Sequence, residues 1–433
     1  MSKKIIIAGG GAAGMCAAIY AARNGADVTI IEKNSQLGKK LSMTGNGRCN
    51  LSNLDMNEKM YNLSAEKRMK EWLSVYGVLD VINFFKSLGI VIKSEERYLY
   101  PVSGQASTVV SAFESEIKRL GVKVIYGEQV KSVKVHEMEP DNKALDAKQI
   151  EAVLTRGAKI DPNREKYTVV TNMNSYEADK VILATGSLSG AKSTMSTGDG
   201  YYICKQLGMT IKDTHPALVG FKCDESETMP TNGVRCTAEI SFMLGVEALA
   251  TEFGELQFTK DGISGIPVMQ ASGKIVKFLE EGKPIYVSIN FFPDYDDDDF
   301  LALEKEMLRL RDDRSLKDFL NGFYNSNIND MVIARMKMGA SMKMKNISES
   351  MVLSIFDSYR NYKIKLSESY GYQQAQVTSG GVSLGDIKDD MTVNGHNGIF
   401  VIGELLDVDG RCGGYNLQWA FTSGSIAGTV ASL

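Results

Sequence analysis

The chain has 433 residues, too many for one ordinary core, so we expect two or three domains. Its apolar and charged fractions, 43% and 24%, are those of a globular protein, and a formal net charge of -4 gives no reason to expect a nucleic-acid partner. No apolar run is long enough to span a bilayer, and the opening Met-Ser-Lys-Lys lacks a signal peptide's apolar region, so we expect a cytoplasmic protein.

The N-terminus predicts one βαβ unit. Residues 4–8 form a short apolar run, as expected of a central parallel strand. A glycine turn follows, then an alanine-rich helix over 12–24 and a second strand over 27–31, closed by Glu32. This spacing is the size that a parallel crossover requires.

The turn has the pattern Gly9-x-Gly11-x-x-Gly14, directly after a strand and at the start of a helix. Glycines at these positions permit a tight turn, close approach of a pyrophosphate and packing of the helix on the strand. Glu32, at the end of the next strand, can accept hydrogen bonds from ribose hydroxyls and would repel a 2′-phosphate. The motif therefore predicts a dinucleotide site for NAD or FAD, but not for NADP.

Further elements of the first half extend this sheet or pack on it. We expect two helices within 65–88, a helix over 107–120, a strand over 122–126, a β-meander with strands near 130–135, 150–155 and 167–171, and a buried strand over 180–184.

The middle of the chain changes to an antiparallel pattern and then to a charged, methionine-rich helical one. Strands are expected over 217–224, 234–243, 246–251 and 285–292, a helix over 268–281, helices within 298–358, and strands again over 363–366, 374–378 and 398–403.

Two downstream segments favour FAD over NAD. The apolar strand Val181–Leu183 leads into Ala184-Thr185-Gly186, which resembles a second motif of two-dinucleotide flavoproteins. Gly403-Glu404 resembles the motif that holds the flavin ribityl chain. The sequence has no second Gly-x-Gly-x-x-Gly, so a nicotinamide donor would bind without a Rossmann domain of its own.

Two glycine-rich loops are candidates for the flavin ring. Gly45-Asn46-Gly47 predicts a turn with positive φ that could bring backbone amides and Arg48 against a planar ring. Gly413-Gly414 precedes a helix that is expected to begin near Tyr415 or Asn416. A helix N-terminus aimed at the N1/C2-carbonyl edge of the flavin would stabilise its reduced, negatively charged form.

No metal centre is expected. The six cysteines form no Cys-x-x-Cys pair and are interpreted as free thiols, and the three histidines are scattered. The acidic run Asp296–Asp299 is interpreted as the first turn of a helix, where carboxylates are favourable. The methionine-rich segment 331–344 is typical of core packing, although methionines also suit a pocket for a bulky apolar ligand.

The predicted cofactor residues come from these segments and their flanks. They are Gly9, Gly11, Ala12, Ala13, Gly14, Glu32, Lys33, Lys40, Gly45, Asn46, Gly47, Arg48, Cys49, Asn50, Val130, Ala184, Thr185, Gly186, Gly403, Glu404, Gly413, Gly414, Tyr415, Asn416 and Leu417.

The order of elements predicts an α/β fold with an insertion. A Rossmann-like FAD-binding domain would comprise residues 1–192 and 368–433. An antiparallel β-barrel-like domain would comprise 193–295 and 359–367, and a small helical domain 296–358.

Motifs along nearly the whole chain resemble a bacterial family of NAD(P)/FAD-dependent oxidoreductases that includes 3-dehydro-bile-acid Δ4,6-reductase and aminoacetone oxidase. The strings Thr44–Asn50 and Gly413–Trp419 are the most specific to it, and Ser196–Tyr201 and Thr378–Ser383 also match. The chain departs from the family at Gly265-Ile-Pro, where Gly-Pro is more common. The resemblance implies a FAD domain, an inserted barrel and a helical domain.

Three functions are weighed. The first is an ene-reductase that uses NADH or NADPH and acts on a small molecule such as a steroid or bile acid, with hydride passing through flavin N5. Tyr415, Arg48 and Asn46 are its candidates for polarising or protonating the substrate. The second is an amine oxidase of the aminoacetone oxidase type that produces hydrogen peroxide. The third is a flavin-binding or RNA-associated protein without turnover.

Overall fold

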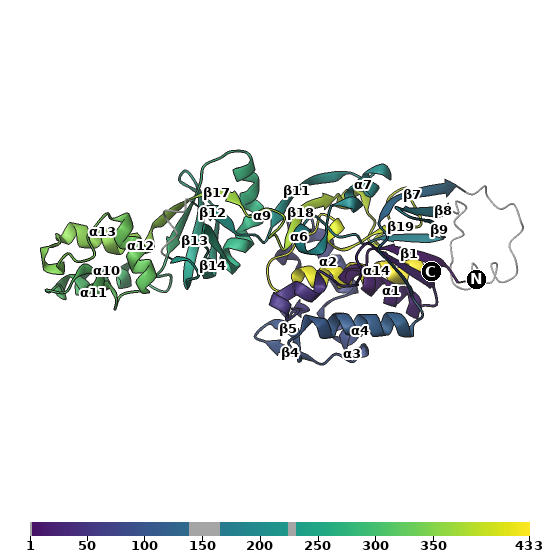
Figure 1. Ribbon diagram of the computed structural model, residues 1–433, viewed down its shortest axis with the longest axis horizontal. Coiled ribbons are helices and arrows are strands. Elements are labelled where there is room, and N and C mark those ends of the chain that lie inside the picture. Colours follow the sequence, from purple (N-terminus) through teal and green to yellow (C-terminus); the bar gives the residue numbers. More distant parts are fainter. Residues whose placement is uncertain (1, 138–164, 224–230) are drawn as a thin grey trace, which may run out of the picture. The chain divides into compact units, whose positions relative to one another are not determined.

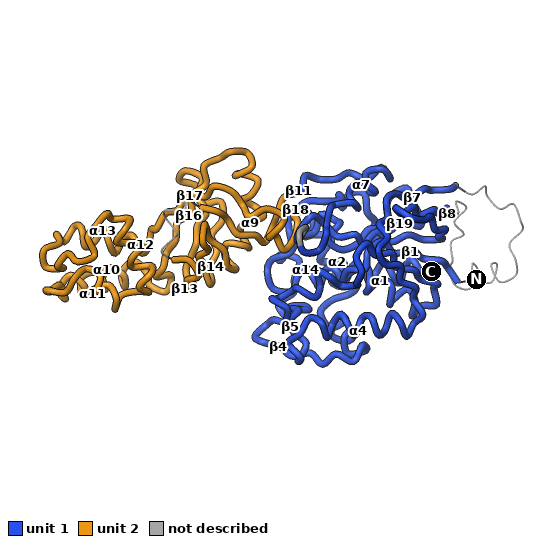
Figure 2. The backbone as a smooth tube through the Cα atoms, in the orientation of Figure 1, with its two compact units in different colours: residues 1–214, 379–433 blue, residues 215–378 orange. Residues whose placement is uncertain are grey.

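The computed structural model describes residues 2–137, 165–223 and 231–433, except for the side chains of residues 191 and 192. Contacts divide the chain into two compact units (Figure 2). Unit 1 comprises residues 1–214 and 379–433, and unit 2 comprises residues 215–378.

Unit 1 is built on a five-stranded parallel sheet (Figure 1). Its strands, in spatial order, are β19 (Ile399–Val401), β10 (Lys180–Leu183), β1 (Lys4–Ala8), β2 (Asp27–Glu32) and β6 (Lys123–Tyr126). The central strand is apolar on both faces because both are covered, and Ile5–Ala8 are buried. The sheet confirms the predicted α/β fold with a Rossmann-type domain.

Helix α1 (Ala12–Arg23) packs closely on the C-terminal helix α14 (Tyr415–Ser432). The close approach depends on two glycines of α14. A Cβ atom at Gly424 would lie 2.6 Å from the carbonyl oxygen of Ala13, and one at Gly428 would lie 2.3 Å from that of Ala17. The first and last segments of the chain therefore share one core.

The remaining elements of unit 1 surround the sheet. They are β3 (Ser52–Asn53), α2 (Glu66–Val75), α3 (Val78–Ser87), β4 (Ile92–Glu95), β5 (Tyr98–Pro101), α4 (Ala106–Arg119), α6 (Ala191–Thr194) and α7 (Asp199–Gln206), with short 3₁₀ helices η1 (Leu41–Gly47), η2 (Glu58–Met60), η5 (Leu384–Asp386) and η6 (Gly403–Leu405). Strands β3, β5 and β4 form a small sheet in that order.

The expected meander is an antiparallel sheet of β7 (Val130–Glu137), β8 (Glu165–Thr171) and β9 (Ser175–Ala178). The strand predicted near 150–155 lies outside the described residues.

Unit 2 contains a closed antiparallel barrel with helices inserted between its strands. The barrel order is β12 (Phe221–Cys223), β15 (Gly262–Gly265), β14 (Glu247–Phe258), β13 (Arg235–Leu244), β16 (Ile285–Asn290) and β17 (Tyr362–Ser369). The helices are α9 (Ile266–Glu280), α10 (Asp297–Arg309), α11 (Leu316–Leu320), α12 (Ser326–Arg335) and α13 (Glu349–Arg360), with the 3₁₀ helix η4 (Met344–Asn346).

The barrel interior and the helices between β16 and β17 share one cluster of buried apolar side chains. This cluster joins Phe242 and Val287 to Phe300 and Phe356. Asp296 caps α10 by accepting a hydrogen bond from the Asp299 amide, so the acidic run opens a helix, as interpreted. Residues 193–214, expected in the inserted domain, lie in unit 1 because α7 packs on β7 there. The division into three domains remains a prediction.

Several predicted strands have different bounds, among them the strand expected over 246–251, which is β14 and extends to Phe258. The strand expected over 217–224 is divided into β11 (Ile211–Ala217) and β12, because Leu218 has a φ of 50° that extended backbone does not adopt. The strand expected over 374–378 is β18 (Val377–Val382), which pairs with β11.

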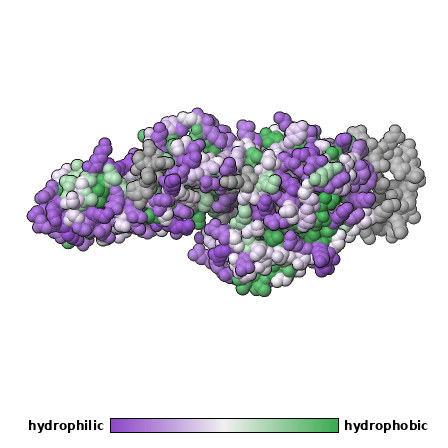
Figure 3. All heavy atoms as spheres, in the orientation of Figure 1, coloured by the Kyte–Doolittle hydropathy of each residue, from purple (hydrophilic) through white to green (hydrophobic). Residues whose placement is uncertain are grey.

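The described residues include no helix with the length and apolarity needed to cross a membrane. On the face shown in Figure 3, hydrophilic side chains cover most of the surface, with small apolar areas between them. All six cysteines are free thiols. The described part of the chain has no cluster of three His, Cys, Asp or Glu side chains that could hold a metal ion.

Candidate cofactor site

The glycine turn between β1 and α1 has the close contacts that the motif predicts. Gly9 has a φ of 108°, and a Cβ atom there would lie 2.4 Å from the Ala184 carbonyl oxygen. A Cβ atom at Gly14 would lie 2.0 Å from the Gly9 carbonyl oxygen. Gly11, by contrast, faces open space. The turn therefore leaves room for a phosphate group at the N-terminus of α1.

Glu32 ends β2 and holds its carboxylate against the turn. Its Oε2 atom accepts a hydrogen bond of 2.7 Å from the Gly10 amide, and its Oε1 atom accepts bonds of 2.8 and 2.7 Å from the backbone and side-chain nitrogens of Asn34. A carboxylate can accept about four hydrogen bonds. Glu32 can therefore accept one more, from a ribose hydroxyl.

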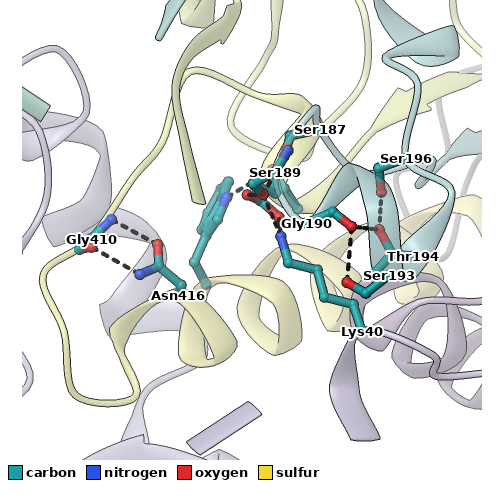
Figure 4. A network of polar contacts seen from close by, with 12 residues as sticks. Lys40, Ser187, Ser189, Gly190, Ser193, Thr194, Ser196, Gly410 and Asn416 are labelled. Atoms are coloured by element: carbon teal, nitrogen blue, oxygen red, sulfur yellow. Dashed lines mark hydrogen bonds and ion pairs between the residues drawn. The ribbon is translucent and has the colours of Figure 1, made fainter. Parts of the chain in front are cut away.

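Lys33 and Lys40 tie distant segments together. Lys33 Nζ lies 3.0 Å from Asp199 Oδ2, which joins the end of β2 to the start of α7. Lys40 Nζ donates to Glu404 Oε2 and to Ser189 Oγ, both at 2.6 Å, and Ser189 Oγ donates to Glu404 Oε1 at 2.7 Å. Figure 4 shows Lys40 reaching towards Ser187 and Ser189. The Lys40–Ser189–Glu404 network joins three of the predicted flavin segments.

The loop at Gly45–Gly47 has the predicted positive φ values, 57° at Gly45 and 55° at Asn46. The Arg48 side chain contacts two strands of the small sheet of unit 1. Its guanidinium donates to Glu95 at 2.5 Å and lies 4.3 Å from the centre of the Tyr100 ring. Cys49 is buried, and burial raises the pKa of its thiol to about 11, so it is a packed side chain and not a nucleophile at neutral pH.

The second glycine loop leads into α14, which begins at Tyr415 as predicted. Gly413 and Gly414 have φ values of 121° and 94°. The Gly413 carbonyl accepts a bond of 2.9 Å from Asn53, and a Cβ atom at Gly414 would lie 2.7 Å from the Ser52 backbone. Among the residues that the structure describes, no side chain caps this helix. Its first amides are therefore available to a negatively charged group.

The side chains at the start of α14 are held from several directions. Asn416 donates to and accepts from the Gly410 backbone, both at 2.8 Å, as Figure 4 shows. The Tyr61 hydroxyl donates to the Tyr415 carbonyl at 2.9 Å. Burial raises the pKa of the Tyr415 phenol above its ordinary value of 10.0, so this side chain is neutral at pH 7 and can donate a hydrogen bond.

Two buried polar atoms at the predicted flavin segments lack hydrogen-bond partners among the described residues. They are the Oδ1 atom of Asn50 and the Oγ1 atom of Thr185. Buried polar atoms are nearly always paired, so both indicate a missing polar ligand. Gly186, next to Thr185, faces open space. These residues fit FAD, with its phosphates, ribityl hydroxyls and polar ring edge.

All the predicted site residues lie in unit 1. Val130 is a buried residue of β7, and Ala12, Ala13 and Leu417 lie in the first turns of α1 and α14. Sequence reasoning missed several residues that contact them, because their partners are far away in the chain. These are Asn53, Ser187, Ser189 and Asp199.

Unit 2 has a separate open pocket of about 370 Å³. It contains none of the predicted cofactor residues and is lined mainly by aromatic and polar side chains, among them Arg235, Phe291, Phe292, Tyr295 and Tyr324.

The chain is similar to known proteins over nearly its whole length. Residues 3–430 match the family model described as HI0933-like protein Rossmann domain. The chain is 33% identical over 432 residues to a 3-dehydro-bile acid delta(4,6)-reductase of Clostridium scindens, which covers 99% of both chains. It is 27% identical over 428 residues to a ribosomal RNA dihydrouridine synthase of Haemophilus influenzae, with 96% of each covered.

A solved structure shares the fold. The 3-ketosteroid-delta4-(5alpha)-dehydrogenase of Rhodococcus jostii, in complex with 4-androstene-3,17-dione, superposes with a TM-score of 0.51 and 14% identity, covering 100% of this chain and 97% of that one. Together with the cofactor site, the match over nearly the whole length identifies the chain as a member of the HI0933-like Rossmann family and as an FAD-dependent oxidoreductase.

Proposed function

We propose that the protein is an ene-reductase that takes electrons from NADH or NADPH and saturates a carbon–carbon double bond conjugated to a ketone, with a 3-oxo steroid or bile acid as its substrate. The observation that carries this proposal is the 33% identity, over 99% of both chains, to a 3-dehydro-bile acid delta(4,6)-reductase. The dinucleotide turn and the uncapped α14 supply the site that such chemistry needs.

The chain's own residues would bind and orient the FAD. Gly11 and the N-terminus of α1 would hold the pyrophosphate, and Glu32 a ribose. The Lys40–Ser189–Glu404 network would orient the ribityl chain, and the first amides of α14 would face the pyrimidine edge. FAD, when bound, supplies hydride transfer. Tyr415, Arg48 and Asn46 remain the candidates for hydrogen bonding to the substrate ketone.

Anaerobic flavin bleaching tests the proposal. NADH or NADPH should bleach the flavin, and addition of a 3-oxo-Δ4,6 bile acid should restore its absorbance with formation of the saturated ketone. Bleaching by aminoacetone, with fast reoxidation by dioxygen, would instead establish an amine oxidase. No bleaching by any of these donors would contradict both enzymatic functions.

A second candidate follows from the relationship to ribosomal RNA dihydrouridine synthases, which stands against our expectation of no nucleic-acid partner. Dihydrouridine is uridine with a saturated C5–C6 bond, and that bond in uracil is also conjugated to a carbonyl. The identity is lower, 27%, and a net charge of -4 opposes attraction of RNA, so we place it second. Incubating the reduced protein with ribosomal RNA and measuring dihydrouridine by mass spectrometry of the nucleosides distinguishes the two.

A further inference from the structure

Asp409 has a buried carboxyl oxygen without a partner. It lies in the loop between η6 and α14, four residues before Gly413. Its Oδ1 atom is inaccessible to solvent and has no hydrogen-bond partner among the described residues. An unpaired charged oxygen in such a place would be costly, whereas a protonated carboxyl group is tolerated.

Neighbouring acidic groups favour the protonated form. Asp407 and Glu404 lie near Asp409, and each of them already has a lysine partner, Lys212 at 2.6 Å and Lys40 at 2.6 Å. Burial, followed by the charges of Asp407 and Glu404, raises the pKa of Asp409 to about 7. A hydrogen bond with the Ser379 side chain lowers this pKa in part. The carboxyl group therefore changes protonation state near neutral pH.

The backbone on both sides of Asp409 is held in place. The Asp409 amide donates to Asn62 Oδ1 at 3.3 Å, and the Asn62 amide donates to the Asp409 carbonyl at 2.9 Å. Gly410 is bonded to Asn416 and bridged to Tyr61. A group fixed in this way, in the loop that leads to the flavin edge of α14, needs little reorganisation before it reacts.

The other candidates are poorer acids at neutral pH. Arg48 is held by Glu95, whose hydrogen bond raises the already high pKa of the guanidinium, and burial raises the pKa of the Tyr415 phenol above its ordinary value of 10.0. A proton donor works best when its pKa lies near the working pH.

We propose that Asp409 is the proton donor in the reduction of the conjugated ketone. The proposal rests on the proposed function. The β-carbon of the enone accepts a hydride, which originates from the reduced nicotinamide, and its double bond to the α-carbon becomes a single bond. The α-carbon takes the proton from the Asp409 carboxyl group. Asp409 as a residue is only partly buried, so the carboxylate left behind regains its proton from solvent between turnovers, and the product is the saturated ketone.

The test compares the FAD-loaded wild-type protein with D409N and with D389N, a control in which the exposed carboxylate of Asp389 is neutralised. D409N should retain its flavin and be reduced by NADH or NADPH at the wild-type rate. Its reoxidation by the 3-oxo-Δ4,6 bile acid should be slower by about 10²- to 10⁴-fold, the usual contribution of general acid catalysis. D389N should match wild type in both half-reactions.

Two further readouts separate proton donation from a structural role. The wild-type reoxidation rate should fall as pH rises above about 7, and D409N should lack that dependence. The infrared difference spectrum between pH 5 and pH 9 should contain a protonated-carboxyl band that D409N alone loses.

The outcomes also separate this proposal from the function on which it rests. Normal reoxidation of D409N, or a carboxyl band that persists in it, overturns the assignment of Asp409 alone. Failure of the wild-type protein to be reoxidised by the enone overturns the ene-reductase function and the assignment together.

Discussion

Single residues matter most in this protein where a buried polar group has a specific partner or lacks one. Glu32 and Glu404 are each held by two or more donors, whereas Asn50, Thr185 and Asp409 each have an oxygen that finds no partner in the described part of the chain. The first kind of residue shapes the site before the cofactor arrives. The second kind has an oxygen available to bind a ligand or to take part in a proton transfer.

The Lys40–Glu404 pair should contribute to FAD affinity. Replacing Lys40 with Met removes the cation that pairs with the partly buried Glu404 carboxylate and leaves the hydrogen bond from Ser189 in place. The pair is about a third exposed on the lysine side, so we expect a loss of only about 1–2 kcal/mol, or roughly tenfold in Kd. Flavin fluorescence titration of the two proteins measures the Kd for FAD. The adjacent Lys39→Met, whose side chain makes a long hydrogen bond of 3.4 Å to Asn34 in the wild type, should bind FAD as the wild-type protein does.

Asp409 should also make stability depend on pH. Its pKa is about 7 in the folded protein against an ordinary 3.8, so the folded state binds the proton more tightly. The resulting stabilisation is fully present below about pH 4 and is lost as pH rises through 7. D409N stays neutral throughout. Between pH 4 and pH 8, the free energy of unfolding of D409N should therefore rise relative to that of the wild type by on the order of 3 kcal/mol.

Thermal unfolding of the FAD-saturated proteins at several pH values measures this difference. Parallel pH profiles for D409N and wild type would show that the carboxyl group is already ionised at pH 5 in the folded state.

At the scale of elements, the contact between α1 and α14 connects the N-terminal motif to the C-terminal one. Its closeness comes from Gly424 and Gly428, whose missing Cβ atoms let the two helix backbones approach. The first turns of both helices lie at cofactor loops. A shift of one helix against the other would therefore move the pyrophosphate and flavin ends of the site relative to each other.

Gly424→Ala should be destabilising although alanine has the higher helix propensity. The added methyl group would lie 2.6 Å from the Ala13 carbonyl oxygen, so the helices must separate, at a cost of about 1–3 kcal/mol. Gly385→Ala, whose methyl group would meet only the Ser383 hydroxyl at an ordinary 3.5 Å, is the matched control. Urea unfolding of both variants gives the comparison, and equal midpoints would show that the helix contact can relax.

At the scale of the whole molecule, the two units differ in how the chain builds them. Unit 1 needs both ends of the chain, because β19 and α14 complete the sheet and core that β1 and α1 begin. Unit 2 is one continuous segment with its own buried cluster, which runs from Val219 to Ala375.

A fragment of residues 215–378 should therefore fold without the rest of the chain and without FAD. Circular dichroism should show its mixed strand and helix content and a cooperative thermal transition, and the purified fragment should lack flavin absorbance. A fragment that remains unfolded would show that unit 2 depends on contacts with unit 1.

The sequence by itself determined the features that rest on neighbouring residues. The Gly9–Gly14 turn, the positive φ values at Gly45 and Asn46 and the start of α14 at Tyr415 are local, because backbone sterics and helix capping act within a few residues. Segment 217–224 is an exception, since one left-handed residue, Leu218, divides a strand that apolar patterning alone predicts as continuous.

Only the tertiary structure decided which distant groups meet. Lys40 and Glu404 are 364 positions apart in the chain, and they pair because the parallel sheet brings the loops after β2 and β19 to the same edge. Arg48 meets Glu95 and Tyr100 because β3, which follows it in the chain, forms a small sheet with β5 and β4. Asp409 lies buried near Asp407 and Glu404. Burial and pairing depend on the order of strands in space, which no local pattern records.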